Sequence, residues 1–550
     1  MRAMWSGIFI LGLMNAATPT LAAEGNAPSG AWYVTKAEWT EADEKGFGEF
    51  VRAIGHSGCT TSVACLKDPA NPYRSSDPKE LKFLADCADF PYMLRAYYAW
   101  KNGLPFGYVN GVSGKGSDIR FENGNRPSSR RDLVDHGGGI PALATLGEIH
   151  VGVWSATYRT NPGFEDGILS DFYSPKLQPG TIRPGTAVYD TNGHVGLIYD
   201  IEPDGRLDYM DAHPDFAVSR SVYGPQFGQS PARLGGGIKN WRPMKLVGYR
   251  TENGRLIGGH IVVAPNKDIP DYSMEQYTGN VADDVGDGEN ARFRYSNVEL
   301  SFYEYLRVAV GGGQATYNPT YELRSTIRTL CNDLKDRVFA VDLAVKEGIN
   351  KKAQPGHLPD NIYEASDQEW ESYATPSRDA RLKTAFASLY IDMQKMLFLW
   401  QQRDLRIAYE GLDLKADLQK AYAEETKACE ITYANSQGAP VTLAFDEVKD
   451  RLFLLDFDPY HCIERRWGAT GKELESCADD ENKARWYKAE QRLRNQPDRT
   501  YEARMGFTLV QLEKGVDNSG ADTPPTIDVK DMIDRIGQRV VFAGMKPVGR

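Results

Sequence analysis

Two patterns of hydrophobic and polar residues divide the chain. Residues 30–265 carry short runs of alternating polarity among Gly, aromatic residues and turn signals, a pattern typical of β-strands. From about residue 295 to 515, apolar residues recur at helical spacing. Residues 266–292 lose this periodicity and gather acidic residues and Gly, which predicts a linker. We therefore expect an α+β domain over 30–265 and an all-α helical domain over 293–550.

Three long helices are expected in the second half. The run 321–346 contains no Pro or Gly, which predicts one continuous helix. Thr375 and Pro376 have the form of an N-cap followed by Pro at the first helical position. The helix that they begin is expected to end before Gly411. A further helix is predicted over 412–433.

The first 22 residues have the order of a secretory signal peptide. One Arg precedes an apolar run of ten residues, Trp5–Met14, and small or polar residues follow it. Small side chains at positions 20 and 22 favour cleavage after Ala22, with cleavage after Ala23 as the alternative. The apolar run is too short to span a hydrocarbon core of about 30 Å. We therefore expect a periplasmic or secreted protein with no membrane span.

Charge and histidine spacing exclude several classes of partner. The chain holds 64 Lys and Arg against 75 Asp and Glu, a formal charge of −11, so a basic surface for nucleic acid is not expected. Its eight His show no HExxH or His-x-His spacing, and His461-Cys462 has no clustered partners in the sequence. We expect no metal site and no cofactor.

Export makes disulfide bonds the expected state of most of the seven cysteines. Two pairs flank short loops, and two further cysteines fall in helical segments that a bond would join. Six cysteines allow fifteen pairings. The spacing favours Cys59 with Cys65, Cys331 with Cys429, and Cys462 with Cys477. Cys87 is then left without a partner.

Cys87 lies next to the start of a predicted helix. Asp86 or Asp89 can cap a helix that ends near Gly103. At such a position the helix dipole and free backbone N–H groups stabilise a thiolate and can receive an oxyanion. The alternative is that Cys87 is a small apolar residue on the buried face. One face of this helix is marked by Phe90, Met93, Leu94, Tyr97 and Trp100.

A second segment predicts three neighbouring antiparallel strands. Residues 182–190 indicate a turn that enters a strand, and residues 191–193 (Thr-Asn-Gly) form a hairpin turn signal. The returning strand is expected over 194–201. A turn at 203–205 leads into the third strand at 206–211.

This arrangement supplies a candidate base for the thiol. His194 opens the second strand and Asp211 closes the third, so the two side chains can lie together at one end of the sheet. A carboxylate partner fixes the tautomer of an imidazole that takes the proton of a thiol such as Cys87. His213 is a competing orienting residue. The alternative interpretation of His194 is a surface residue at a turn.

At these residues the chain resembles a family of enzymes. The segments DCADF and RPGTAVYDTNGHVGLIYDIEPDGRLDYMDAH are similar to the papain-like cysteine hydrolases of bacterial cell walls, the NlpC/P60 and CHAP families. The resemblance covers residues 86–103 and 182–214. It implies a papain-like domain in which a helix bearing Cys87 packs on an antiparallel sheet, with His194 as base. The acidic and amide partners of that family would fall on Asp211 and His213.

Three functions are consistent with these residues. The first is an exported hydrolase of peptide or amide bonds, with peptidoglycan or a peptide as substrate, that acts through Cys87, His194 and Asp211. The second is a transglutaminase-like acyltransferase or deamidase, because residues 86–100 are also similar to that family. The third is a secreted binding protein without turnover. Residues 104–180 are expected to form a wall of the substrate cleft. The helical half has two possible roles: it recognises the substrate, or it binds a protein or cell-wall partner.

Overall fold

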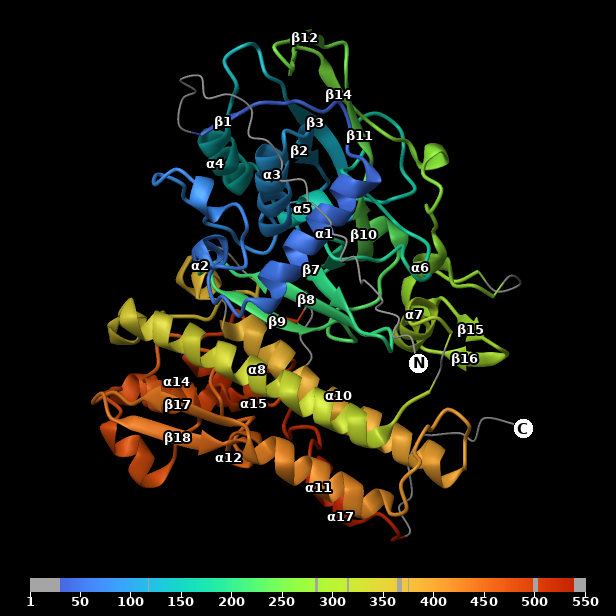
Figure 1. Ribbon diagram of the computed structural model, residues 1–550. Helices are drawn as coiled ribbons and strands as arrows, with labels where there is room; N and C mark the ends of the chain where they lie inside the picture. Colours follow the sequence, from blue (N-terminus) through green and yellow to red (C-terminus); the bar gives the residue numbers. More distant parts are fainter. Residues whose placement is uncertain are drawn as a thin grey trace, which may run out of the picture.

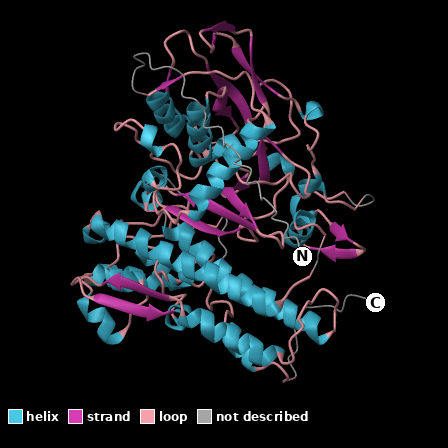
Figure 2. Cartoon of the chain, viewed as in Figure 1, coloured by secondary structure: helices cyan, strands magenta, loops and turns pink. Residues whose placement is uncertain are grey.

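The computed structural model describes residues 30–116, 118–281, 285–313, 316–363, 368–373, 375–497 and 503–538. Most of the strands lie in the first half of the chain, and the longest helices lie in the second half (Figures 1 and 2). The predicted signal peptide, residues 1–22, lies outside the described residues. No helix among the described residues is long and apolar enough to cross a membrane.

The centre of the first half is a six-stranded antiparallel sheet. Its strand order is β5-β10-β6-β7-β8-β9, and the predicted three-strand segment forms its middle as β6, β7 and β8. The register pairs Asp190 with His194 and Leu197 with Met210. The six strands are β5 (Phe172–Tyr173), β6 (Ala187–Asp190), β7 (His194–Ile201), β8 (Leu207–Ala212), β9 (Val218–Val222) and β10 (Gly237–Trp241).

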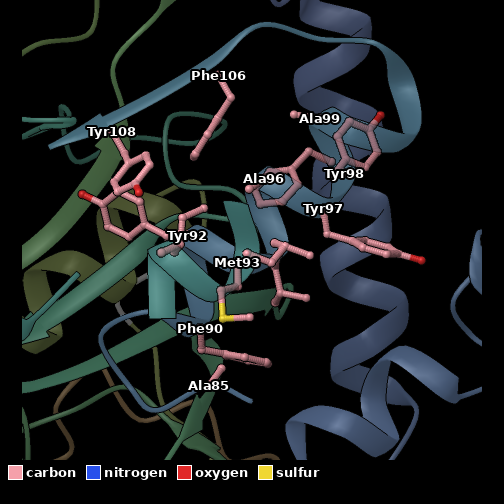
Figure 3. Packing of buried hydrophobic residues seen from close by; sticks show 14 of the residues in the cluster. Ala85, Phe90, Tyr92, Met93, Ala96, Tyr97, Tyr98, Ala99, Phe106 and Tyr108 are labelled. Carbon is pink, nitrogen blue, oxygen red and sulfur yellow. The ribbon is translucent and has the colours of Figure 1, made fainter. Parts of the chain in front are cut away.

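One face of this sheet is covered by α1 (Glu41–His56) and α3 (Phe90–Asn102). Strand residues such as Tyr189, Val195 and Leu197 join the apolar faces of these helices in a single core. Helix α3 ends at Gly103, as predicted, where a φ of +63° favours glycine. Figure 3 shows the aromatic side chains of α3 packed with those of β2 (Phe106–Ser113) in this core.

The other face of the sheet is covered by the segment that the sequence indicated as a linker and by the start of the expected helical domain. Val188, Ile198 and Tyr209 alternate with the residues of the first core. They pack against β15 (Phe293–Tyr295), β16 (Val298–Leu300) and α7 (Phe302–Val310). Within the linker segment, Gln276 is buried and its amide bonds the backbone of Ile238 in β10. Residues 266–310 therefore include side chains that pack on the second face of the sheet, across the predicted boundary at residue 265.

Smaller elements surround this sheet. Segment 104–180, expected to wall the cleft, holds a long hairpin and two helices. The strands are β1 (Ala31–Trp32), β2 (Phe106–Ser113), β3 (Arg126–Leu133), β4 (Ile140–Pro141), β11 (Met244–Val247), β12 (Arg250–Glu252), β13 (Arg255–Ile257), β14 (His260–Val263), β15 (Phe293–Tyr295) and β16 (Val298–Leu300). The helices are α2 (Ser62–Lys67), α4 (Ala142–Gly152), α5 (Ser155–Tyr158) and α6 (Glu275–Thr278).

The second half is mainly helical but not all-α. Two long predicted helices are present as α8 (Pro319–Lys346) and α10 (Thr375–Gln401). The helix expected over 412–433 ends earlier, as α11 (Leu414–Lys427), because its last residues form β17 (Glu430–Ala434), paired with β18 (Pro440–Ala444). The other helices are α9 (Gln368–Ser372), α12 (Phe445–Asp450), α13 (Ile463–Arg466), α14 (Glu481–Ala489), α15 (Gln491–Arg494), α16 (Leu509–Lys514) and α17 (Val529–Asp534).

Three disulfides join the cysteines in the pairs that the spacing favours. They are Cys59–Cys65, Cys331–Cys429 and Cys462–Cys477. Cys429 lies between α11 and β17 rather than within a helix, so its bond joins α8 to the start of a hairpin. Cys87 is the free cysteine. Disulfides in this number are typical of proteins that leave the reducing cytoplasm.

The two halves are held together along one edge of the sheet. Helix α8 packs against β9, the edge strand, and α10 lies beside α8 (Figure 1). Arg378 on α10 makes two hydrogen bonds of 2.9 Å to the buried carboxylate of Asp215, which follows β8. Covering an edge strand in this way removes a row of unpaired backbone groups from solvent. It also brings α10 next to the end of the sheet that carries His194.

Candidate active site

The turn that carries Cys87 is held by its neighbours. One carboxylate oxygen of Asp86 accepts hydrogen bonds from the backbone N–H groups of Ala88, at 2.8 Å, and Asp89, at 3.4 Å. The hydroxyl of Tyr158 donates to the carbonyl of Ala88 at 2.8 Å. Helix α3 begins only at Phe90, so Cys87 precedes the helix by three residues. The thiol is thus placed by a capped turn.

The thiol of Cys87 lies against the first residues of β7. Its Sγ is 3.8 Å from the carbonyl oxygen of Gly193 and also meets the backbone of Val195. These two residues are the neighbours of His194 on either side. The backbone N–H of Cys87 itself makes no hydrogen bond with any described residue, which leaves it available to a ligand.

His194 and Asp211 form the predicted pair. Nε2 of His194 lies 2.5 Å from a carboxylate oxygen of Asp211, and both side chains are buried. A carboxylate only accepts hydrogen bonds, so Nε2 carries the proton. Nδ1 then holds the free lone pair, and it has no partner among the described residues. This is the tautomer that a general base needs.

His213, the competing orienting residue, supports Asp211 instead. Its ring stacks on His194 with centroids 5.6 Å apart, and its Nε2 lies 2.7 Å from the hydroxyl of Ser219. That hydroxyl donates to the second carboxylate oxygen of Asp211 at 2.5 Å. Nε2 of His213 also lies 3.6 Å from the carboxylate oxygen of Asp211 that bonds His194, so His213 supports Asp211 both directly and through Ser219.

The protonation states differ from the sequence expectation of a stabilised thiolate. Burial, and next the charge of Asp86, raise the pKa of Cys87 well above its ordinary value of 9.0. Burial and the positive charge of Arg381 lower the pKa of His194. The expected lowering of the thiol pKa is wrong because the helix starts three residues later and the nearest charge is negative. Thiol and imidazole are both neutral at pH 7.

The buried carboxylate stays charged. Burial opposes the charge of Asp211, but the two histidines and Arg381 together lower its pKa far below the usual range. With a neutral thiol and a neutral imidazole, proton transfer from Cys87 has to accompany attack on a substrate. A preformed thiolate–imidazolium pair is not the resting state.

This resting state predicts a pH dependence of alkylation. The rate constant for reaction of Cys87 with iodoacetamide is expected to be low at pH 7 and to rise through pH 9, because the pKa of the thiol lies above its ordinary value. Only the thiolate reacts, so the rate grows about tenfold per pH unit below the pKa. Timed quenching and mass spectrometry of the Cys87 peptide measure it. A rate already constant between pH 6 and 8 would contradict the assignment.

Cys87 and His194 open into one cavity of about 500 Å³, a size typical of ligand sites. Residues from segment 104–180 and from the helical half complete its walls. Segment 104–180 was expected to form such a wall. The lining residues are Asp86, Cys87, Ala88, Asp118, Arg120, Phe121, His150, Val153, Trp154, Ser155, Asn192, Gly193, His194, His213, Pro214, Ile362, Tyr363, Ser377 and Arg381.

The cavity holds a second imidazole that the sequence did not indicate. Nδ1 of His150 bonds the carboxylate of Asp89, and this bond is the main cause that raises the pKa of His150. A raised pKa makes His150 a poorer proton acceptor near neutrality than His194. The thiol contacts the two neighbours of His194, so geometry also favours His194. No local pattern indicates His150, because its partner Asp89 is 61 residues away in the chain.

Another cluster missed in the sequence lies in the helical half. Ligand atoms of Asp456, His461 and Glu490 lie within 4.8 Å of one another, and all three side chains are buried. The expectation that His461 has no clustered partners is therefore wrong, because the turn after α14 brings Glu490 to it. Arg494 lies 3.5 Å from Asp456 and Nε2 of His461 lies 3.0 Å from the carbonyl of Lys483. This cluster is a network of opposite charges.

Comparisons with protein-family models, curated proteins and solved structures found no match to this chain.

Proposed function

We propose that this protein is an exported cysteine hydrolase that cleaves peptide or amide bonds, with the peptides of peptidoglycan as substrate. One observation carries the proposal. The free thiol of Cys87 lies against the backbone on both sides of His194, whose Nε2 bonds the buried Asp211. A nucleophile, a base with its lone pair free, and an orienting carboxylate are the parts that acyl transfer requires.

The proposed reaction begins when Nδ1 of His194 takes the proton of Cys87. The sulfur bonds to the carbonyl carbon of the substrate, and the backbone N–H of Cys87 donates to the oxyanion. The C–N bond then breaks, and His194 gives its proton to the leaving amine. Water, deprotonated by His194, then attacks the thioester. The C–S bond breaks, the acid product leaves, and the proton on His194 restores the thiol of Cys87.

The location of the protein follows from two features. The order of residues 1–22 is that of a signal peptide. The three disulfides support an oxidising compartment. We infer that the mature chain acts in the periplasm or outside the cell, where its proposed substrate lies.

Zymography on purified cell wall tests the proposal, with Cys87→Ala as the matched protein. Clearing by the native chain and none by the variant is the expected result, since the acyl-enzyme cannot form without the thiol. Equal clearing by both proteins would refute it. Incorporation of dansylcadaverine into protein without release of wall peptides would indicate the acyltransferase function instead. No turnover in either assay would leave the binding-protein function.

A further inference from the structure

The cavity at Cys87 contains a positive side chain that no carboxylate of the described residues contacts directly. Arg381 lies on α10 and lines this cavity, yet it makes no hydrogen bond or ion pair with any described residue. Its neighbour Arg378, one turn earlier, is paired with Asp215. Arg120, the other guanidinium of the cavity, is paired with Asp118 at 2.7 Å. Of the two guanidinium groups that line the cavity, Arg381 is thus the one whose N–H donors make no hydrogen bond to a described residue.

The charge of Arg381 acts on the catalytic groups. It lowers the pKa of His194 and also that of Asp211. A cation near His194 disfavours the imidazolium that the proposed reaction forms. An anion bound to Arg381 would offset this charge when the substrate is present. Binding at Arg381 and proton transfer from Cys87 to His194 would then both favour substrates that carry a negative charge.

We propose that Arg381 forms a subsite for a carboxylate of the ligand that occupies this cavity. The planar guanidinium donates two parallel hydrogen bonds that match a carboxylate. The acids that share the cavity, Asp86 among them, disfavour a doubly charged group such as phosphate. As a statement about hydrolysis, this inference rests on the proposed function. The substrates are then peptides that carry a free carboxylate close to the cleaved bond. The helical half selects the substrate through this residue.

Protection of Cys87 from iodoacetamide tests the subsite without turnover. Glutarate is the probe, glutaramide is its neutral counterpart, and mass spectrometry measures alkylation at pH 8. Glutarate is expected to slow alkylation of the wild-type chain, and glutaramide is not. In Arg381→Met the half-protecting concentration of glutarate is expected to rise at least about tenfold, the effect of losing a charged hydrogen-bond pair.

A matched variant controls for net charge. Arg403, which is exposed just beyond the far end of α10, lies about 30 Å along the helix from Arg381 at 1.5 Å per residue. Arg403→Met is expected to keep the protection of the wild-type chain. Equal protection of Arg381→Met and wild type, or no protection of wild type by 50 mM glutarate, would overturn the subsite. Protection by inorganic phosphate equal to that by glutarate would overturn its assignment to carboxylates.

Turnover separates this inference from the proposed function. Soluble wall peptides are offered before and after their carboxylates are converted to amides with ammonia and a carbodiimide. Wild type is expected to cleave the acids at least about tenfold faster in kcat/KM, and Arg381→Met to lose that preference. Equal losses on both substrates would overturn the inference. Glutarate protection without cleavage of any peptide would refute the hydrolase and leave the subsite standing.

Discussion

Replacing His194 with alanine is expected to lower kcat/KM for cleavage of wall peptides by about 10⁴-fold, whereas His150→Ala lowers it by less than about tenfold. The reason is the protonation state of the thiol. Burial raises the pKa of Cys87, so attack depends on a base that removes the proton. His194 has a free lone pair at Nδ1 and a pKa lowered by burial, while the pKa of His150 is raised. Release of amines from purified wall peptides measures both variants.

The two histidines are matched for this comparison, since both line the cavity and both bond a buried carboxylate. Circular dichroism and the melting temperature of each variant control for folding, because His194 is almost fully buried. A large loss in His150→Ala with a small one in His194→Ala would transfer the role of base to His150. Equal large losses in two folded variants would show that neither histidine alone is the base.

Removing the Cys331–Cys429 disulfide with two alanines is expected to lower the free energy of unfolding by about 4 to 5 kcal/mol. The bond spans 98 residues, and the loop entropy that a disulfide removes from the unfolded chain grows with loop length. The same change at Cys59–Cys65, which spans 6 residues, is expected to cost only about 2 kcal/mol. Urea unfolding followed by tryptophan fluorescence measures the difference.

The third bond provides an internal standard for this series. Cys462–Cys477 spans 15 residues and is expected to fall between the other two, at about 3 kcal/mol. All six cysteines except Cys477 are buried, so removal of the sulfur atoms costs a similar amount in most positions. Losses that are equal in all three variants, or largest for Cys59–Cys65, would show that native packing and not loop length controls the effect.

Local patterns predicted the middle of the sheet and the pair of residues at its end. Alternation and turn signals placed His194 and Asp211 at the ends of adjacent strands, and the observed strands β7 and β8 put these side chains in contact. Such a prediction succeeds because register within a hairpin is determined over a few residues. The disulfide pairs could be predicted for a related reason, since two of them close short loops.

The features that the sequence did not predict depend on distant parts of the chain. Residues 266–292 have the composition of a linker, yet Gln276 within them is buried against β10, and the residues that follow pack on the second face of the sheet. The raised pKa of Cys87 follows from burial and from the capped turn at Asp86, which composition does not reveal. Arg381 reaches the cavity because the start of α10 lies beside the residues that follow β8, where Arg378 bonds Asp215.

The shared cavity has a consequence for the order of events after synthesis. Its first wall comes from residues 86–214, whereas Arg381 belongs to α10, a helix made much later, as does Arg378, which pairs with Asp215. That helix packs on α8, which a disulfide secures to Cys429. In a chain that has folded only its first half, the cavity at Cys87 therefore lacks one of its walls. We infer that the cavity is complete only after the second half of the chain has docked on the sheet.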